Sequence, residues 1–268
     1  MTGFVAGCDL GSTAGKALIM RDNQIIAYAI INAAAKPEET ARKVMDEALR
    51  NAGLESLGEI GAVICTGYGR SKFPYEHENI SEITCHARGA YWLSPKVRTL
   101  IDIGGQDCKV IAMDDGGKVR DFGMNDKCAA GTGRFFEVMA RVLEIDLKEL
   151  SSLARQSTNP VSITSQCSVF VESEVVSLMN DGVNLADIAA GLHASIAGRL
   201  TSQVKSLGPV EEDISVSGGC AKNRSLIEYL QKKLGKTIQI LPEDPQIVGA
   251  LGAALIAATR PDKSALRR

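Results

Sequence analysis

The sequence lacks several features that would place it in common classes of protein. No stretch of its 268 residues approaches the roughly 18 uninterrupted apolar residues of a membrane span. Asp9 interrupts the first apolar run, so no signal peptide is evident. The net charge of −2 argues against general binding to nucleic acid or anionic membranes. We therefore expect a cytoplasmic protein with no nucleic-acid partner and no membrane partner.

Histidine and paired cysteine are also scarce. His77, His86 and His193 are too few and too scattered to suggest a metal site, and we expect ordinary surface or hydrogen-bonded residues. The seven cysteines form an odd count without a C-x-x-C pair, which argues against a disulfide framework in a reducing compartment. Most of them are expected to be small buried hydrophobic residues.

Two common nucleotide-binding motifs are absent. The tail of a P-loop occurs at Gly235, but Leu230 occupies the first glycine position of that motif and a strand follows. A G-x-G-x-x-G sequence begins at Gly131, but Phe136 stands where its last glycine should be. Neither a Walker-type ATPase nor a Rossmann dehydrogenase is supported.

Strand-like and helix-like runs alternate along the chain, which is typical of an α/β protein. Helices are predicted from Pro37 to about residue 52 and over 249–258, and the chain beyond Cys128 is mainly helical up to residue 213. Strands are predicted at residues 4–9, 16–20, 24–31, 62–66, 99–102, 109–113, 118–122, 213–217 and 236–241.

Two of the strand groups resemble each other. DLGSTAGKALIMRDN, from Asp9, aligns without gaps on DIGGQDCKVIAMDDG, from Asp102. Both copies follow a strand and precede a hairpin, so they suggest two related subdomains that each offer an Asp-x-Gly turn to a common cleft. We assign residues 1–96 and 246–268 to the first subdomain and 97–245 to the second. Chance similarity of two strand–turn–strand units is the alternative.

The turns of these copies suit phosphate and magnesium. A glycine-rich turn can direct successive backbone N–H groups at a phosphate, and Ser12, Thr13 and Lys16 add hydroxyl groups and a positive charge. Asp9 and Asp102 end their strands, where their carboxylates suit Mg²⁺ bound through its retained waters. A third loop, SGGCAKN from Ser217, would let a flat ligand lie against its backbone.

The ordered set DLGST, DIGGQD and SGG resembles the phosphate-1, phosphate-2 and adenosine motifs of the actin, hexokinase and heat-shock chaperone superfamily. GALGAAL (249–255) is similar to its connector helix. TGYGR (66–70), SEITCHA (81–87), NDKCAAGTGRF (125–135) and residues 167–174 resemble activators of 2-hydroxyacyl-CoA dehydratases, whose pattern the ATPase subunits of benzoyl-CoA reductase share. The resemblance covers residues 9–255.

The resemblance implies two duplicated actin-like (ribonuclease H-like) subdomains around a nucleotide cleft that binds ATP and Mg²⁺. Asp9 and Asp102 would flank the catalytic magnesium and water, and Gln106 would position that water. The implied nucleotide contacts are Ser12, Thr13, Ala14, Gly15, Lys16, Gly104, Gly105, Gly218, Gly219 and Gln246.

Two cysteines stand at or near predicted helix starts. A helix is predicted to begin before Phe135, downstream of Cys128, and another over 169–179, after Cys167. A helix N-terminus favours the thiolate. A 4Fe–4S cluster needs four thiolates, and a two-fold dimer of a chain with two would supply them. The resemblance implies the same: one cluster per homodimer. From spacing alone, two unrelated buried cysteines are the alternative, and the other five are expected to be structural.

The resemblance also implies a function in anaerobic metabolism. The chain would be an ATP-hydrolysing activator that reduces a 2-hydroxyacyl-CoA dehydratase by one low-potential electron and so initiates its radical catalysis. Ferredoxin or flavodoxin would supply that electron. The rival functions are the ATPase subunit of a benzoyl-CoA-type reductase, a small-molecule (sugar) kinase of the same superfamily, and a nucleotide-gated scaffold without redox activity.

Overall fold

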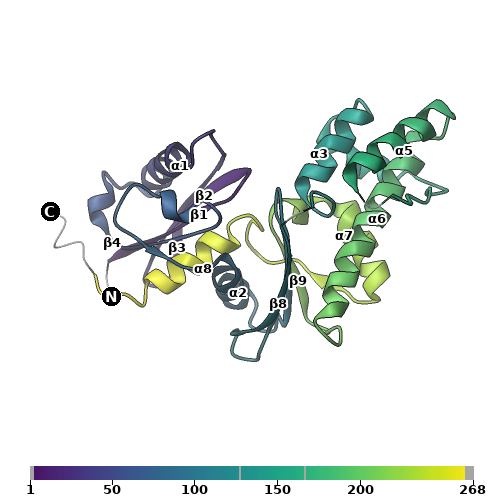
Figure 1. Ribbon diagram of the computed structural model, residues 1–268. Helices are drawn as coiled ribbons and strands as arrows, with labels where there is room; N and C mark the ends of the chain where they lie inside the picture. Colours follow the sequence, from purple (N-terminus) through teal and green to yellow (C-terminus); the bar gives the residue numbers. More distant parts are fainter. Residues whose placement is uncertain (1–2, 127, 166, 263–268) are drawn as a thin grey trace. The chain divides into compact units, whose positions relative to one another are not determined.

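The computed structural model describes residues 3–126, 128–165 and 167–262, which form two compact units (Figure 1). Unit 1 contains the chain up to residue 100, residues 111–120, and the chain from residue 240. Unit 2 contains residues 101–110 and 121–239. The subdomain boundaries at 96/97 and 245/246 stay a prediction. Among the described helices, none is long and apolar enough to cross a membrane.

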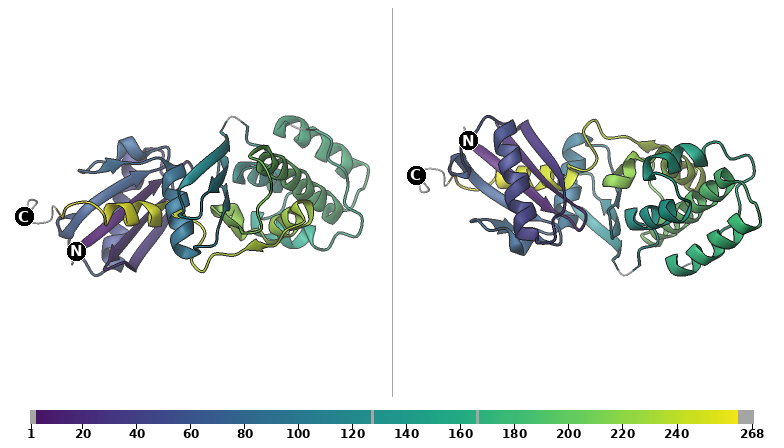
Figure 2. Two further views of the ribbon diagram at one scale, coloured as in Figure 1. Left: turned by 90° about the horizontal axis from the view of Figure 1, so that it is seen from below. Right: turned by 90° about the horizontal axis from the view of Figure 1, so that it is seen from above.

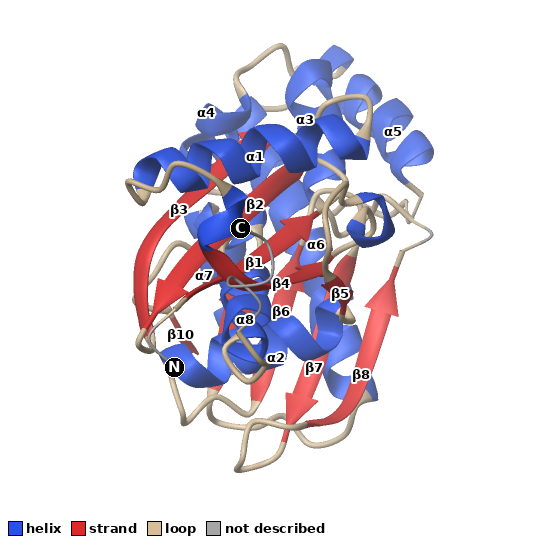
Figure 3. Ribbon diagram, turned by 90° about the vertical axis from the view of Figure 1, so that its left-hand side faces the viewer, coloured by secondary structure: helices blue, strands red, loops and turns tan. Residues whose placement is uncertain are grey.

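The first sheet has the strand order β3-β2-β1-β4-β5. β1 pairs antiparallel with β2 and parallel with β4, and β2 pairs antiparallel with β3 (Figure 3). All four strands predicted here are confirmed, and the two-residue strand β5 was not predicted. The strands are β1 (Phe4–Leu10), β2 (Ala14–Arg21), β3 (Gln24–Asn32), β4 (Ile60–Thr66) and β5 (Glu78–Asn79).

Helices cover both faces of this sheet. Side chains of a strand alternate between faces, so Ala6 and Cys8 of β1 pack in the cluster that contains α1 (Pro37–Asn51), whereas Val5 packs with α8 (Val248–Ala257). Figure 1 shows these two helices on opposite sides of the strands. A Cβ at Gly7 would collide with the carbonyl oxygen of Ala250, so glycine allows α8 to lie directly on β1. The predicted closing helix is thus confirmed as a core element.

The second sheet has the strand order β10-β9-β6-β7-β8. Its three sequential strands β6, β7 and β8 lie side by side, as β1, β2 and β3 do in the first sheet, which supports the predicted duplication. Its last strand is shorter than the predicted 236–241. The strands are β6 (Thr99–Ile103), β7 (Cys108–Met113), β8 (Val119–Asn125), β9 (Ile214–Ser217) and β10 (Ile238–Gln239).

Most of the helices lie in unit 2, as predicted for the chain beyond Cys128. They gather beside strands of their own unit, in teal and green in Figure 2. Phe135 and Phe136 lie at the start of α3 (Gly133–Val142). They are almost fully buried in a core that also contains residues of α6 (Leu185–Ser206). The helices of unit 2 are α3 (Gly133–Val142), α4 (Leu147–Ala154), α5 (Ser168–Asn180), α6 (Leu185–Ser206) and α7 (Arg224–Leu234); α2 (Glu82–Leu93) belongs to unit 1.

Candidate functional site

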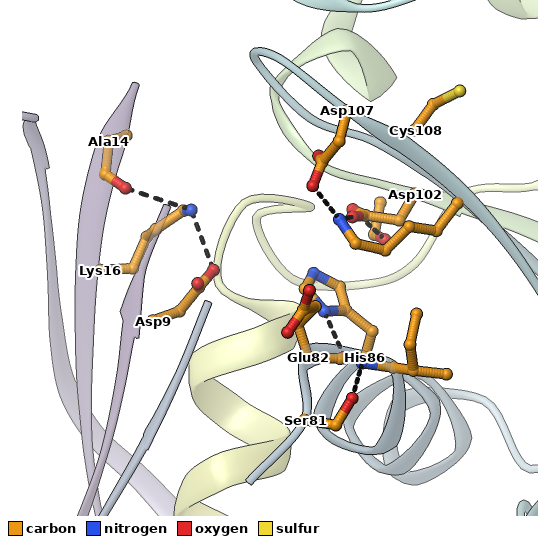
Figure 4. Close-up of polar contacts among 12 residues, drawn as sticks. Asp9, Ala14, Lys16, Ser81, Glu82, His86, Asp102, Asp107 and Cys108 are labelled. Atoms are coloured by element: carbon orange, nitrogen blue, oxygen red, sulfur yellow. Dashed lines mark hydrogen bonds and ion pairs between the residues drawn. The ribbon is translucent and has the colours of Figure 1, made fainter. Parts of the chain in front are cut away.

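The turn between β1 and β2 carries an ion pair between paired strand positions. Asp9 faces Lys16 in the strand register, and Lys16 Nζ lies 2.9 Å from Asp9 Oδ2 (Figure 4). Lys16 Nζ also donates to the carbonyl oxygen of Ala14 at 3.4 Å. Asp9 is only 4% exposed, so its charge is balanced by the adjacent ammonium group. Of the predicted nucleotide contacts in this turn, Ser12, Thr13, Ala14 and Lys16 are half-buried and Gly15 is buried.

The TGYGR motif after β4 forms a second turn, which packs against the Asp9 carboxylate. Gly67 has a φ of +82°, and a Cβ there would lie 2.5 Å from Asp9 Oδ1. Both the backbone conformation and the available space therefore require glycine. The N–H of Gly69 donates to the carbonyl oxygen of Leu10 at 2.9 Å. The motif thus fixes the end of β1, a role that sequence analysis did not assign to it.

An arginine of the same motif connects this turn to α2. Arg70 Nη1 donates to Glu82 Oε2 at 3.0 Å, and the carbonyl oxygen of Glu82 lies 2.9 Å from His86 Nδ1 (Figure 4). His86 Nε2 and Asp9 Oδ2 each lie 3.1 Å from the point where a Cβ of Gly249 would stand. Sequence analysis therefore missed the pairing of Arg70 with Glu82. His86 is hydrogen-bonded, as expected, but its place beside Asp9 was not foreseen.

The other two histidines are hydrogen-bonded, as expected. His193 is fully buried in α6, with Nδ1 2.7 Å from the carbonyl oxygen of Ala189 and Nε2 2.9 Å from Asn223 Nδ2. His77 Nδ1 lies 2.6 Å from the carbonyl oxygen of Tyr75. In both, Nδ1 lies within hydrogen-bond distance of a backbone carbonyl oxygen.

The turn between β6 and β7 repeats the aspartate–lysine pair of the first turn and adds a carboxylate. Lys109 Nζ lies 2.6 Å from Asp107 Oδ2 and 3.4 Å from Asp102 Oδ2 (Figure 4). Asp102 Oδ1 also accepts a hydrogen bond from Ser217 Oγ at 2.9 Å. Asp102 and Lys109 are each 3% exposed. The positions that the gapless alignment equates are thus ion-paired in both copies.

The glycines of this turn are hydrogen-bonded to the start of α3. The carbonyl oxygen of Gly104 accepts from the N–H of Gly133 at 2.9 Å, and that of Gly105 accepts from the N–H of Arg134 at 2.8 Å. The first N–H groups of a helix have no partner within the helix, so the turn satisfies two of them. A movement of the turn would therefore act directly on the beginning of α3.

The third glycine loop follows β9 and passes against the end of β6. Gly218 has a φ of +83°, and a Cβ there would collide with the carbonyl oxygen of Ile103 and lie 3.0 Å from Asp102 Oδ1. Glycine is therefore required at this position. Gly219 is exposed at the start of a short 3₁₀ helix. The remaining predicted site residues are Gln106, exposed in the β6–β7 turn, and Gln246, half-buried before α8.

Cys128 and Cys167 line one pocket of unit 2, with a volume of about 630 Å³. Cys167 is exposed and is the N-cap residue of α5, as predicted. Cys128 is half-buried and lies in the loop and turn before α3, which begins at Gly133, so it stands ahead of the helix rather than at its N-terminus. Other residues that line the pocket are Cys108, Asn125, Arg199 and Gln203.

The other five cysteines fit the predicted structural role. Burial raises the pKa of the Cys108 thiol to about 11 and the pKa values of Cys85 and Cys220 to about 12, and it also raises the pKa of Cys65. Cys8 is buried in β1. Cys108 is the first residue of β7 rather than part of the preceding turn. Over the described ranges, no group of three or more His, Cys, Asp or Glu side chains could hold a metal ion.

These features define an actin-like ATPase fold: two five-stranded sheets, each with an aspartate-bearing glycine turn. A ROK hexokinase from Thermus thermophilus has this fold, with a TM-score of 0.53 and 16% identity over 95% of this chain and 98% of that chain. The model of the BadF/BadG/BcrA/BcrD ATPase family matches residues 6–257. The chain therefore belongs to the BadF/BadG/BcrA/BcrD ATPase family.

Several relatives in this family are activators of dehydratases. The activator of lactoyl-CoA dehydratase from Anaerotignum propionicum is 44% identical over 95% of this chain and 97% of the relative. The (R)-2-hydroxyglutaryl-CoA dehydratase activating ATPase from Acidaminococcus fermentans is 41% identical over 96% and 98%. The activator of the 2-hydroxyisocaproyl-CoA dehydratase from Clostridium difficile, solved with bound ADPNP, has a TM-score of 0.89 and 42% identity over 95% and 94%.

A subunit of the benzoyl-CoA reductase from Thauera aromatica is a further relative, 33% identical over 98% of this chain and 95% of the relative. The family and these relatives support an ATPase activity for the chain.

Proposed function

We propose that the chain is an ATP-hydrolysing iron–sulfur protein that activates a 2-hydroxyacyl-CoA dehydratase by transferring one low-potential electron to it. The observation that carries the proposal is the pair Cys128 and Cys167 in one pocket of an ATPase unit. Relatives of 41–44% identity that match nearly the whole chain act as activators of such dehydratases. The electron initiates the radical catalysis of the partner enzyme.

ATP binds through the three glycine loops and is hydrolysed with Mg²⁺ held through its waters by Asp9 and Asp102. Both carboxylates are nearly buried, and each lies beside a lysine ammonium group, so the waters of the cation would share these carboxylate oxygens with the lysines. Gln106, which is exposed at its turn, positions the attacking water. The other nucleotide contacts are Ser12, Thr13, Ala14, Gly15, Lys16, Gly104, Gly105, Gly218, Gly219 and Gln246.

The cysteine pocket fits half of a 4Fe–4S site. Cys128 and Cys167 supply two of the four thiolates that such a cluster needs, and the exposure of Cys167 leaves it accessible to a second copy of the chain. A homodimer with two-fold symmetry brings two such pairs together. When bound, the cluster supplies one-electron transfer at low potential. The backbone N–H groups of the first turn of α5 would favour the negative charge of a bound cluster.

The hydrolysis and the cysteine pocket are coupled through α3. Nucleotide binding shifts the β6–β7 turn, and the hydrogen bonds from Gly133 to Gly104 and from Arg134 to Gly105 carry that shift to the start of the helix. Cys128 lies in the turn just ahead of that helix. The position of its thiol therefore follows the state of the nucleotide, which is how ATP alters the reducing power of the protein.

A second candidate function is that of an ATPase subunit in a benzoyl-CoA-type reductase. The likeness to the benzoyl-CoA reductase of Thauera aromatica favours it, but the identity of 33% is lower than the 41–44% of the dehydratase activators. A subunit of that kind works with non-identical partners, whereas the activator works as a homodimer. In either case the protein is cytoplasmic and receives its electron from ferredoxin or flavodoxin.

Anaerobic purification followed by iron and sulfide analysis tests the proposal. We expect a brown homodimer with about four iron and four sulfide ions per two chains, as one 4Fe–4S cluster requires. If the protein is colourless, contains no iron and phosphorylates a sugar, it is a kinase rather than an activator. A colourless protein that binds ATP and a partner without any redox activity would instead be a nucleotide-gated scaffold.

A further inference from the structure

The segment that leads to Cys167 is held by a single carboxylate of α5. Residues 160–165 form neither helix nor strand. Glu174 Oε1 accepts hydrogen bonds from the backbone N–H of Thr164 at 2.8 Å and from its hydroxyl group at 2.9 Å. Glu174 Oε2 accepts from the N–H of Ser165 at 2.9 Å. One side chain thus fixes two successive residues of an otherwise irregular segment.

The contacts of Glu174 require an ionised carboxylate. Burial raises the pKa of Glu174, but the hydrogen bonds from Thr164 and Ser165 outweigh that effect, so the pKa lies below its usual value. An ionised carboxylate only accepts hydrogen bonds, and it therefore suits three donors. A glutamine at this position would present one acceptor oxygen and would turn an NH₂ group toward another donor.

The same segment is also held from α6. Arg199 Nη2 donates to the carbonyl oxygen of Ser165 at 3.3 Å, so the residue whose N–H contacts Glu174 is held at its C=O as well. The N–H of Val161 donates to the carbonyl oxygen of Asp187 at 3.2 Å. The segment is therefore held at Val161 and at Ser165. Cys167 stands two positions after Ser165 in the sequence.

Cys128 has a comparable arrangement. Its N–H donates to Asn125 Oδ1 at 3.3 Å. Asn125 Nδ2 donates to the carbonyl oxygens of Cys128 at 3.1 Å and of Ala130 at 3.2 Å. Each of the two cysteines thus has a polar side chain that holds the backbone nearby. Asn125 holds the backbone of Cys128 itself, and Glu174 holds Thr164 and Ser165 ahead of Cys167.

The fold itself has little need of Glu174. Val171 and Val175 of α5 are fully buried in the core of unit 2 and already hold the helix in place. Thr164 and Cys167 are exposed, so the hydrogen bonds of Glu174 organise a surface segment rather than a core. What they add is a defined position for Thr164 and Ser165.

We infer that Glu174 is a positioning residue for Cys167, which holds this thiol ready to bind the cluster before the cluster is present. The inference rests on the proposed function, because it assumes that Cys167 is a cluster ligand. Replacement of a side chain that orients a metal ligand typically lowers the metal affinity about 10- to 100-fold. An ordered ligand segment also loses less conformational entropy when the cluster binds.

The experiment compares Glu174→Gln with Glu172→Gln in the anaerobically purified dimer. Glu172 is exposed on the same helix, so its substitution removes the same charge without touching the segment. The rate at which an iron chelator removes the cluster, and the EPR spectrum of the reduced cluster, are measured for both. Nucleotide affinity and the melting temperature of the cluster-free protein report on the fold.

For Glu174→Gln we expect about 10-fold or faster cluster loss and an altered EPR spectrum, with nucleotide affinity unchanged. Thr164→Val, which removes only the hydroxyl donor, should have a smaller effect in the same direction, and Glu172→Gln should match the wild type. If Glu174→Gln loses its cluster at the wild-type rate and shows the wild-type EPR spectrum, this inference is overturned but the proposed function is not. A melting temperature lowered equally with and without the cluster would also overturn it, because Glu174 would then only stabilise the fold. An iron-free wild-type protein would overturn the proposed function as well.

Discussion

The N–H of Gly133 donates a hydrogen bond to the carbonyl oxygen of Gly104 at 2.9 Å, and so joins the first residue of α3 to the glycine turn after β6. Gly104 belongs to a predicted phosphate-binding turn, and the chain ahead of Gly133 carries Cys128. In the proposed function, nucleotide hydrolysis and a cysteine-bound cluster are therefore linked within unit 2 by this hydrogen bond and by the one from Arg134 to Gly105.

Gly133→Pro removes this hydrogen bond and pushes the Gly104 carbonyl oxygen away, because the proline Cδ takes the place of the amide hydrogen that faces this oxygen. Gly133 is the first helical residue, where proline is well tolerated, and Thr132 before it is extended, as proline requires. Loss of this contact, which includes one hydrogen bond of about 0.5–1.5 kcal/mol, should weaken the effect of ATP on electron transfer about 2- to 10-fold or more, with ATP hydrolysis retained. The measurement is the ratio of reduction rates with and without ATP.

Gly133→Ala is the control, because it keeps the N–H and places its Cβ no closer than 3.4 Å to its neighbours. An unchanged ratio in Gly133→Pro would show that the coupling runs elsewhere.

Asp9→Asn and Asp102→Asn should each lower kcat for ATP hydrolysis by about 10²–10³-fold, in line with the loss of one charge that stabilises the transition state. Steady-state phosphate release measures this. Asp22→Asn serves as the control, because Asp22 is exposed and has a φ of +51°, a conformation that asparagine tolerates. A similar loss in all three variants, or none in the first two, would refute the assigned roles.

Gly218→Ala should destabilise the protein and weaken nucleotide binding. The added Cβ would be strained by the positive φ and would collide with the carbonyl oxygen of Ile103, which together should cost about 1–3 kcal/mol or more. Gly235 also has a positive φ, of +67°, but nothing lies within 4 Å of its Cβ position. Gly235→Ala should therefore show only the smaller backbone cost and normal nucleotide affinity. Equal effects in thermal unfolding and nucleotide titration would contradict this account.

Cys167 should be the first cysteine alkylated in the cluster-free protein. Iodoacetamide reacts with thiolates, and the pKa of about 11 for Cys108 and of about 12 for Cys85 and Cys220 keeps these thiols protonated at pH 7 to 9. Their reactivity should rise only as the pH approaches those values. Mass spectrometry of timed samples at several pH values gives the order of modification. Modification of Cys85, Cys108 or half-buried Cys220 as fast as Cys167 at pH 8 would be inconsistent with these raised pKa values.

The elements that the sequence predicts best are those with a strong local pattern. The apolar runs of β1, β2 and β4 and the small-residue run of α8 mark buried elements, and both copies of the aspartate–lysine pair follow from one gapless alignment. The two-residue strand β5 has no periodicity of its own, because its pairing with β4 comes from the surrounding fold. Cys128 and Cys167 are 39 residues apart in the sequence, and only the folding of unit 2 brings them to one pocket.

The residues that support the site were missed because their partners are non-local. Arg70 and Glu82 stand in two separate motifs, TGYGR and SEITCHA, and nothing in either motif states that the two side chains pair. Glu174 likewise contacts the backbone N–H groups of Thr164 and Ser165, ten and nine positions earlier, and such contacts leave no mark in the sequence. The available signal for these residues was a charged side chain inside an otherwise apolar or glycine-rich motif. Arg70, Glu82 and Glu174 each have this character, and each is hydrogen-bonded in the structure.

The central claim is tested most directly by anaerobic reduction of a 2-hydroxyacyl-CoA dehydratase. The chain is reduced with ferredoxin or flavodoxin and mixed with the dehydratase, with and without ATP and Mg²⁺, and the appearance of dehydratase activity is followed. We predict activation by the wild type only with ATP, and none by Cys128→Ser or Cys167→Ser, both of which should still bind the nucleotide. Activation at the same rate without ATP, or by either serine variant, would contradict the account.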